Sequence, residues 1–281
     1  MKVILLLACP DRPGIAHGVY GLIRRQGGNV VDSDQHRDER ENAFLMRVEW
    51  ETKRKGLTEK GVLAGCARIA KLFKAEHQVV FPNRKRRIAV MVTKEAHCLV
   101  AIIQAQKLGE INGHIDLVIG NRADLEQTAE REQIPFRHIP IDPEGKPAAE
   151  RQELELLRTR RIDLVVMARY MQVLSPHFLK HAPPVINIHH AFLPAFPGPS
   201  PYARAFDRGV KQIGATAHYA TAVLDDGPII TQETTRVGHK DALDDFIRNG
   251  RKNECLALVE AVRLHCAGRV IVYGKKTVVF K

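Results

Sequence analysis

The chain has 281 residues, of which 44% are hydrophobic, and this composition excludes an intrinsically disordered protein. Its formal net charge is +11, but no aromatic residues interleave with the two basic runs at 53–55 and 84–87, so we expect solvated charge and no nucleic-acid partner. No apolar run reaches the ~20 residues of a membrane span, and the five cysteines form no C-x-x-C pair, which favours a cytoplasmic protein with reduced thiols and no membrane partner.

Residues 1–83 predict a ferredoxin-like domain. The apolar start of the chain is too short for a signal peptide and is followed at once by Asp11 and Arg12, which indicates a buried strand. Apolar residues then recur at helical spacing or in short extended runs. The expected elements are a strand at 2–8, a helix between the turn 11–14 and Gly27, strands at 29–36 and 43–50, a helix at 57–73 and a strand at 77–81. This order, β-α-β-β-α-β, is that of a ferredoxin-like sandwich.

Residues 84–281 predict a Rossmann-like domain, because short continuous apolar runs alternate with helical segments, as in a parallel sheet buried on both faces. The expected strands are 88–92, 115–119, 164–168 and 185–188, with helices at 95–107, 123–133 and 147–160 between them. Antiparallel strands at 214–219 and 229–237, a helix at 242–265 and a terminal hairpin of strands 269–273 and 277–280 follow. The sequence therefore indicates an α/β protein with two domains, 1–83 and 84–281.

Two polar residues stand at the end of the strand at 185–188. Because strand side chains alternate between the two faces, Asn187 and His189 point to the same side. In open parallel sheets ligands bind beyond the carboxyl ends of the strands, so an amide and an imidazole lie where a substrate is expected. The residues alone equally allow both side chains simply to satisfy local backbone groups.

The remaining candidates are less specific. Asp225 precedes Asp226-Gly227-Pro228, and an acidic pair in a Gly-Pro turn is usually only a turn. His218 is either a core or a ligand-facing histidine. No metal is expected, because the adjacent His189 and His190 of one strand point to opposite faces. No cysteine is supported as a catalytic nucleophile. Neither a dinucleotide-binding glycine motif nor a Walker motif occurs, which argues against the common nucleotide enzymes.

The motifs around these residues resemble the formyltransferase superfamily over about residues 86–281. They are Asn187-Ile-His189, Leu193-Pro194 with Gly198, and Leu224-Asp225-Asp226-Gly-Pro-Ile-Ile230. Within that group the chain is most similar to the formyltetrahydrofolate deformylases, in His189-His190 with the following Phe-Leu-Pro-Ala-Phe, in 214–219 and in 272–280. Those enzymes carry an N-terminal ACT domain, and Asp11-Arg-Pro-Gly14, Gly27-Gly-Asn29 and Asp34-Gln-His36 resemble its signature.

The resemblance implies hydrolysis of 10-formyltetrahydrofolate to formate and tetrahydrofolate, without a tightly bound cofactor, to supply formate for purine synthesis and balance one-carbon pools. It implies that Asn187 and protonated His189 donate to the developing oxyanion and that Asp225 stabilises the imidazolium and orients the water. It also implies a substrate site in which backbone groups read the pterin edge. The implied residues are Met167, Ala168, Arg169, Tyr170, Met171, Val173, His218, Ala222, Leu224 and Gly227.

The ACT resemblance implies a regulatory small amino acid at the first loop, formed by Asp11, Arg12, Pro13 and Gly14, and a homodimer or homotetramer. Three places depart from the superfamily pattern beside the implied site and bear on rate and acceptor specificity. They are Ala191 in place of Ser, the segment Gly198-Pro199-Ser200-Pro201-Tyr202, and Lys252 in place of an acid. Two alternatives remain: a folate-dependent formyltransferase with an amine acceptor, and an amino-acid-sensing protein with a weakened catalytic domain.

Overall fold

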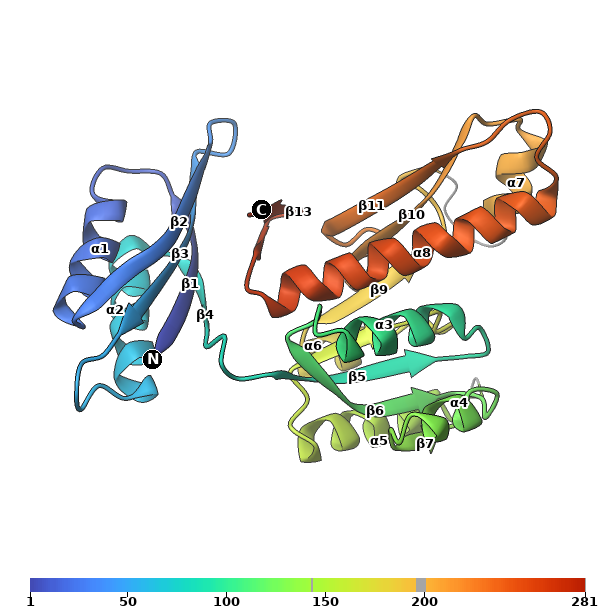
Figure 1. The fold of residues 1–281 in the computed structure, drawn as a ribbon, viewed down its shortest axis with the longest axis horizontal. Coiled ribbons are helices and arrows are strands. Elements are labelled where there is room, and N and C mark those ends of the chain that lie inside the picture. Colours follow the sequence, from blue (N-terminus) through green and yellow to red (C-terminus); the bar gives the residue numbers. More distant parts are fainter. Residues whose placement is uncertain (143, 196–200, 281) are drawn as a thin grey trace. The chain divides into compact units, whose positions relative to one another are not determined.

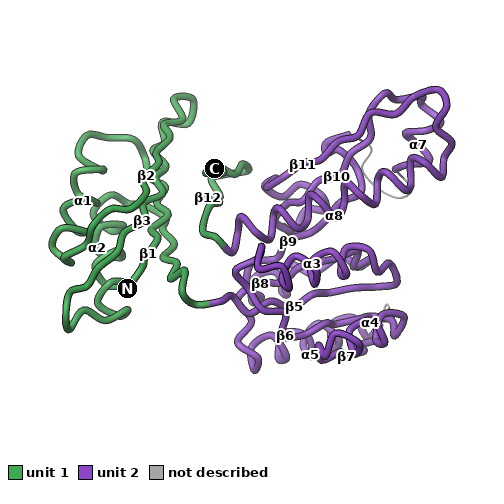
Figure 2. Tube along the Cα trace, in the orientation of Figure 1, with its two compact units in different colours: residues 1–84, 267–281 green, residues 85–266 purple. Residues whose placement is uncertain are grey.

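The structure of the chain is a computed structural model that describes residues 1–142, 144–195 and 201–280 (Figure 1). The chain forms two compact units: residues 1–84 with 267–281, called unit 1 here, and residues 85–266, called unit 2 (Figure 2). No helix in the described ranges is long and apolar enough to cross a membrane.

Unit 1 contains a four-stranded antiparallel sheet and two helices. Its strands lie in the order β2-β3-β1-β4, and the chain order β-α-β-β-α-β is the predicted one. The elements are β1 (Lys2–Pro10), α1 (Ile15–Arg25), β2 (Gly28–Asp38), β3 (Ala43–Thr52), α2 (Glu59–Phe73) and β4 (Glu76–Val80). The predicted ferredoxin-like arrangement is confirmed.

Strand β1 is buried on both faces, which explains its continuous apolar run. Leu5 and Leu7 pack against α1 and α2, whereas Ile4 faces the opposite side of the sheet. There it meets Ile271 and Phe280, which belong to a C-terminal hairpin. The hairpin strands are β12 (Val270–Tyr273) and β13 (Lys276–Val279).

This packing places the hairpin in unit 1, whereas the sequence-based division placed residues 267–281 in the second domain. The buried guanidinium of Arg47 in β3 adds a polar contact, because its Nε donates to the carbonyl oxygen of Gly268 at 3.1 Å. A strand at each end of the chain therefore contributes to one core.

Unit 2 contains a seven-stranded sheet in the order β11-β10-β9-β8-β5-β6-β7, parallel from β9 to β7 and antiparallel at β10 and β11. Its strands are β5 (Arg86–Val92), β6 (Gly113–Gly120), β7 (Phe136–His138), β8 (Leu164–Met167), β9 (Val185–His189), β10 (Gln212–Tyr219) and β11 (Ile229–Arg236). Its helices are α3 (His97–Lys107), α4 (Glu126–Arg131), α5 (Lys146–Thr159), α6 (Pro176–His181), α7 (Pro201–Asp207) and α8 (Leu243–Cys266). The predicted Rossmann-like sheet is confirmed; the short β7, α6 and α7 were not predicted.

Helices cover both faces of this sheet. Helices α5 and α6 pack on the face to which Ala89 and Met91 of β5 point, through Leu157 and Phe178. Helices α3 and α8 pack against each other on the other face, and α8 runs along β9, β10 and β11 (Figure 1). The strand order reverses between β5 and β8, so the carboxyl ends of β5, β8 and β9 are where an open α/β sheet binds its ligand.

Candidate active site

Strand β9 presents Asn187 and His189 on one face, as predicted. The strand pairs with β8 in parallel and with β10 antiparallel, so that Asn187 lies opposite both Met167 and His218. Asn187 and His189 line the same cavity at the carboxyl end of the sheet, with a volume of about 260 Å³. The alternation of strand side chains, together with the neighbouring strands, thus brings the predicted amide and imidazole together.

His218 fixes the orientation of the Asn187 amide. Nδ1 of His218 lies 3.0 Å from the carbonyl oxygen of Tyr219, to which it donates, and Nε2 lies 3.2 Å from Nδ2 of Asn187. Burial lowers the pKa of His218, so the ring is neutral and its Nε2 accepts a hydrogen bond from Asn187. One amide hydrogen of Asn187 is thereby used, and the second is free to serve a ligand.

Asp225 completes the group. Its Oδ1 lies 3.3 Å from Nδ1 of His189 and 3.9 Å from Nε2 of His218. Burial acts to raise the pKa of Asp225, but the hydrogen bond from His189 and the nearby imidazoles outweigh it, and the pKa is lowered. Asp225 therefore stays ionised and accepts the hydrogen bond from Nδ1 of His189.

Backbone geometry holds Asp225 at this place. Its φ of 57° lies in the left-handed region, which Asp and Asn tolerate better than most residues. Two residues later, a Cβ on Gly227 would lie only 1.7 Å from the carbonyl oxygen of Tyr219. The loop can approach the end of β10 only because residue 227 has no side chain.

The second nitrogen of His189 faces a different environment. Among the described residues, Nε2 of His189 is buried and has no hydrogen-bond partner. The neighbouring His190 cannot replace it as a cationic donor, because burial and the positive charge of Arg169 lower its pKa to about 4. An acceptor on a bound molecule would satisfy Nε2 of His189 once the ring is protonated.

Most of the residues implied for substrate binding lie at this cavity. Met167, Arg169, Tyr170, Met171, Val173 and Leu224 line it together with Asn187, His189 and Asp225. His218 lines a smaller adjoining cavity of about 30 Å³. Ala168, Ala222 and Gly227 are not among the lining residues of either. Gln172, which the sequence interpretation passed over, lines both.

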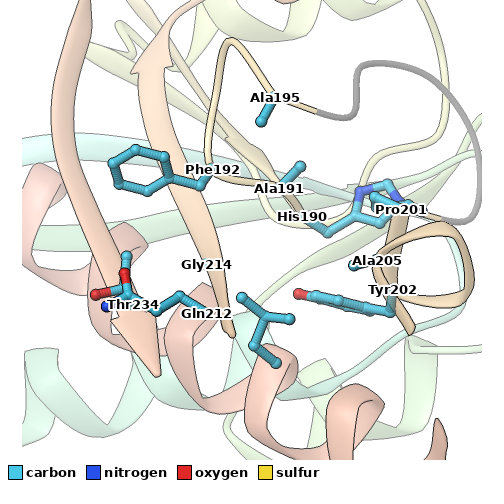
Figure 3. A pocket seen from close by; sticks show the side chains of 11 residues that line it. His190, Ala191, Phe192, Ala195, Pro201, Tyr202, Ala205, Gln212, Gly214 and Thr234 are labelled. Carbon is cyan, nitrogen blue, oxygen red and sulfur yellow. The ribbon is translucent and has the colours of Figure 1, made fainter. Parts of the chain in front are cut away.

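Ala191 faces a separate pocket. This pocket, of about 130 Å³, lies between the chain after β9 and strand β10, with the rings of Phe192 and Tyr202 at opposite ends of it (Figure 3). The segment 198–202 also departs from the superfamily pattern. Its last residues, Pro201 and Tyr202, begin helix α7, whereas Gly198, Pro199 and Ser200 lie outside the described residues. Ala191, which stands where the superfamily has Ser, therefore lies next to the Asn187 cavity without lining it.

The sequence interpretation missed a buried carboxylate, Glu254 of α8, while Lys252 is exposed. One oxygen of Glu254 lies 2.8 Å from Nε2 of His97 and 3.4 Å from Nε of Arg169, and the other accepts from Tyr202 at 2.7 Å. Burial alone would raise the pKa of Glu254, yet these partners lower it. Ligand atoms of His97, Cys98 and Glu254 lie within 4.8 Å of one another, but the carboxylate is already hydrogen-bonded to His97 and Tyr202 and ion-paired with Arg169, so we assign no metal.

The predicted regulatory loop is already held by contacts within unit 1. The carboxylate of Asp11 lies 2.6 Å from Nε of Arg37, and the guanidinium of Arg12 lies 4.9 Å from the centre of the Phe73 ring. Gly14 has a φ of 92° and open space where a Cβ would be. A nearby cavity of about 340 Å³ has Pro10 on its wall but none of residues 11–14.

Several known proteins are similar to this chain in sequence and fold. Residues 86–262 match the model of the formyl transferase family. The chain is 46% identical to a formyltetrahydrofolate deformylase of Synechocystis sp. over 100% of this chain and 99% of the relative. A crystal structure of a formyltetrahydrofolate deformylase from Pseudomonas syringae pv. tomato superposes with a TM-score of 0.95 at 38% identity, covering 100% of this chain and 95% of that one.

A glycinamide ribonucleotide transformylase of Symbiobacterium toebii matches differently. It has a TM-score of 0.66 and 33% identity, covering 70% of this chain and 95% of that chain. The transformylase thus matches over a part of this chain, whereas the deformylases match it from end to end. The chain therefore belongs to the formyl transferase family and, within it, to the formyltetrahydrofolate deformylases.

Proposed function

We propose that this chain hydrolyses 10-formyltetrahydrofolate to formate and tetrahydrofolate in the cavity around His189. The arrangement of His189 supports this best: Nδ1 is 3.3 Å from the Asp225 carboxylate, while Nε2 is buried at the cavity without a hydrogen-bond partner in the described part of the chain. The oxygen of a formyl group is an acceptor that suits this vacant donor position. The relatives that match over the full length are named for this reaction.

The proposed chemistry begins with attack of water on the formyl carbon. The carbonyl oxygen then carries negative charge, and the free amide hydrogen of Asn187 and the Nε2 hydrogen of protonated His189 donate to it. Asp225 stabilises the imidazolium and accepts a hydrogen bond from the attacking water. As the C–N bond breaks, the proton taken from water passes to the folate nitrogen. Acid-base help of this kind typically contributes ~10²–10⁴-fold.

The same cavity suits the pterin ring. Met171, Val173 and Leu224 are apolar, and their exposed fractions are 55%, 51% and 61%. All three stand on the cavity wall, where a flat heteroaromatic ring would cover them. We propose that backbone groups of the segments 167–173 and 222–227 bind the polar edge of that ring.

We place this reaction in the cytoplasm, where it would supply formate for purine synthesis. The cysteines Cys9, Cys66, Cys98, Cys255 and Cys266 are all free thiols in the structure, which suits a reducing compartment.

Unit 1 is the proposed regulatory part. We propose that a small amino acid binds at the loop 11–14 and that copies of the chain associate as a homodimer or homotetramer. Strand β2 supports association: it is an edge strand of the sheet, and Val30 and Val31 in it are 38% and 51% exposed. A mass of one chain, 31.5 kDa, in light scattering would refute the association.

An Asn187→Ala variant tests the proposed site. We expect its release of formate from 10-formyltetrahydrofolate to fall by about 10²–10³-fold, the usual cost of removing one oxyanion donor. Its thermal unfolding should stay close to that of the parent, because Asn187 is only partly buried. A stable variant with undiminished formate release would remove Asn187 from the mechanism.

A further inference from the structure

Two cysteines meet where helices α3 and α8 pack against each other. Cys98 lies in the first turn of α3 and is fully buried, and Cys255 on α8 is partly exposed. The Cys98 sulfur lies within 4.8 Å of a carboxylate oxygen of Glu254, the residue before Cys255. The Cys255 sulfur also lies 3.5 Å from the carbonyl oxygen of His97. Because His97 precedes Cys98, each sulfur lies beside the residue that precedes the other cysteine, and the two cysteines are neighbours across the interface of α3 and α8.

The pKa of Cys255 is lowered, whereas the pKa values of Cys98 and the other three cysteines are raised. The neighbouring Cys98 thiol lowers the pKa of Cys255 even though burial opposes it, and the His97 imidazole adds to the effect. Burial instead raises the pKa of Cys66 to about 11 and of Cys266 to about 12. Because the thiolate is the nucleophilic form, Cys255 is the cysteine that an oxidant should attack first.

We propose that Cys255 and Cys98 form a reversible disulfide bond when the protein meets a peroxide. The thiolate of Cys255 attacks one peroxide oxygen, the O–O bond breaks, and Cys255 becomes a sulfenic acid while hydroxide leaves. The Cys98 sulfur then attacks the Cys255 sulfur, and the sulfenic oxygen leaves as water with the proton of Cys98. In total, two thiols lose two electrons and two protons, and one hydrogen peroxide becomes two waters.

The residues next to these cysteines connect the bond to the cavity. His97 precedes Cys98, and Glu254 precedes Cys255. Nε2 of His97 lies 2.8 Å from a carboxylate oxygen of Glu254. Glu254 also lies 3.4 Å from Arg169 on the cavity wall. A disulfide requires the sulfurs to approach to about 2.05 Å, so α3 and α8 must shift locally and disturb this hydrogen-bonded group. We therefore expect oxidation to lower turnover at the proposed active site, a part of the inference that rests on the proposed function.

The bond itself is tested without reference to activity. The full-length protein is treated with hydrogen peroxide, and free thiols are counted after denaturation. Five cysteines should fall to three, and dithiothreitol should restore five. Cys66→Ala, a matched control outside the pair, should still lose two thiols. Cys98→Ala should form no bond and should instead trap a sulfenic acid at Cys255 that dimedone labels. Retention of all five thiols, or loss of two in Cys98→Ala by intramolecular bonding, would overturn the proposal.

The effect on the site is measured separately as formate release before and after peroxide. A loss of up to about 10²-fold is expected from a displacement near 1 Å, restored by dithiothreitol and absent in Cys98→Ala. If the bond forms with turnover unchanged, the thiol pair remains a modification site but its connection to the cavity is refuted. If the untreated protein releases no formate, the proposed function fails, while the thiol count still decides whether the bond forms.

Discussion

Replacing Asp225 by asparagine removes one charge while changing little else. Asparagine has the same shape as aspartate, and it is among the few residues that adopt the left-handed backbone found at residue 225, where φ is 57°. The amide that replaces the carboxylate would still reach His189, but it would no longer stabilise an imidazolium. The variant therefore isolates the electrostatic contribution of the carboxylate.

The size of the effect follows from the distance. Two opposite charges 3.3 Å apart attract each other by about 5 kcal/mol at an effective dielectric constant of ~20. The side chains of His189 and Asp225 are only 7% and 10% exposed, so solvent screens this pair little. Since about 1.4 kcal/mol corresponds to tenfold in rate, we expect kcat/KM to fall by about 10³-fold, within the ~10²–10⁴ range of acid-base help.

The assay is formate release from 10-formyltetrahydrofolate, with thermal unfolding as the check on folding. Asp226→Asn is the matched control, because it removes the same charge from an exposed residue that does not line the cavity. A folded Asp225→Asn protein with at least half the parent kcat/KM would refute the role of the carboxylate. So would an equal loss in both variants, since it would indicate a general effect of charge.

Three further predictions concern the surroundings of the cavity. Burial raises the pKa of Glu153 from its ordinary 4.5 to about 7, partly offset by the hydrogen bond from Tyr170. The folded state thus binds the proton more tightly than the unfolded state, so stability falls as pH rises from about 4.5 to about 7, by ~3 kcal/mol in all. Glu153→Gln should remove this fall in chemical denaturation measured at pH 5 and pH 8, and parallel curves for parent and variant would contradict it. Gly227→Ala should reduce formate release by about 10²-fold by displacing the Asp225 loop, whereas Gly238→Ala, where the nearest atom lies 3.7 Å from the added Cβ, should be tolerated; equal activities would show that the loop adapts. Glu254→Gln should destabilise the fold by about 3 kcal/mol in urea unfolding because Arg169 loses its buried counter-charge, and an unchanged midpoint would show that the pair contributes nothing.

Local pattern was enough to predict β9 and the common face of Asn187 and His189, because alternation along a strand depends only on adjacent residues. The resemblance added Asp225 and most of the cavity wall. Glu254 could not be found this way, since its partners His97 and Arg169 are far away in sequence and only the packing of α3, α8 and the segment after β8 joins them. The pattern of residues along a helix does not distinguish a buried glutamate with three polar partners from an exposed one.

The sequence did contain a signal for the position of the C-terminal hairpin. A strand at the centre of a ferredoxin-like sheet needs apolar residues only on its helix-facing side, yet β1 is apolar on both. Ile4 and Leu6 on the second side required a cover, which Ile271 and Phe280 provide. The short β7, α6 and α7 lacked any such signal, because three to seven residues are too few to establish a period.

Whether water is the acceptor of the formyl group is decided by incubating the purified protein with 10-formyltetrahydrofolate alone and measuring both products. We predict that formate and tetrahydrofolate appear in equal amounts over many turnovers with no amine added. If neither appears until an amine is supplied, and the formyl group is then found on that amine, the protein is a transferase and the account of hydrolysis at His189 and Asp225 is wrong.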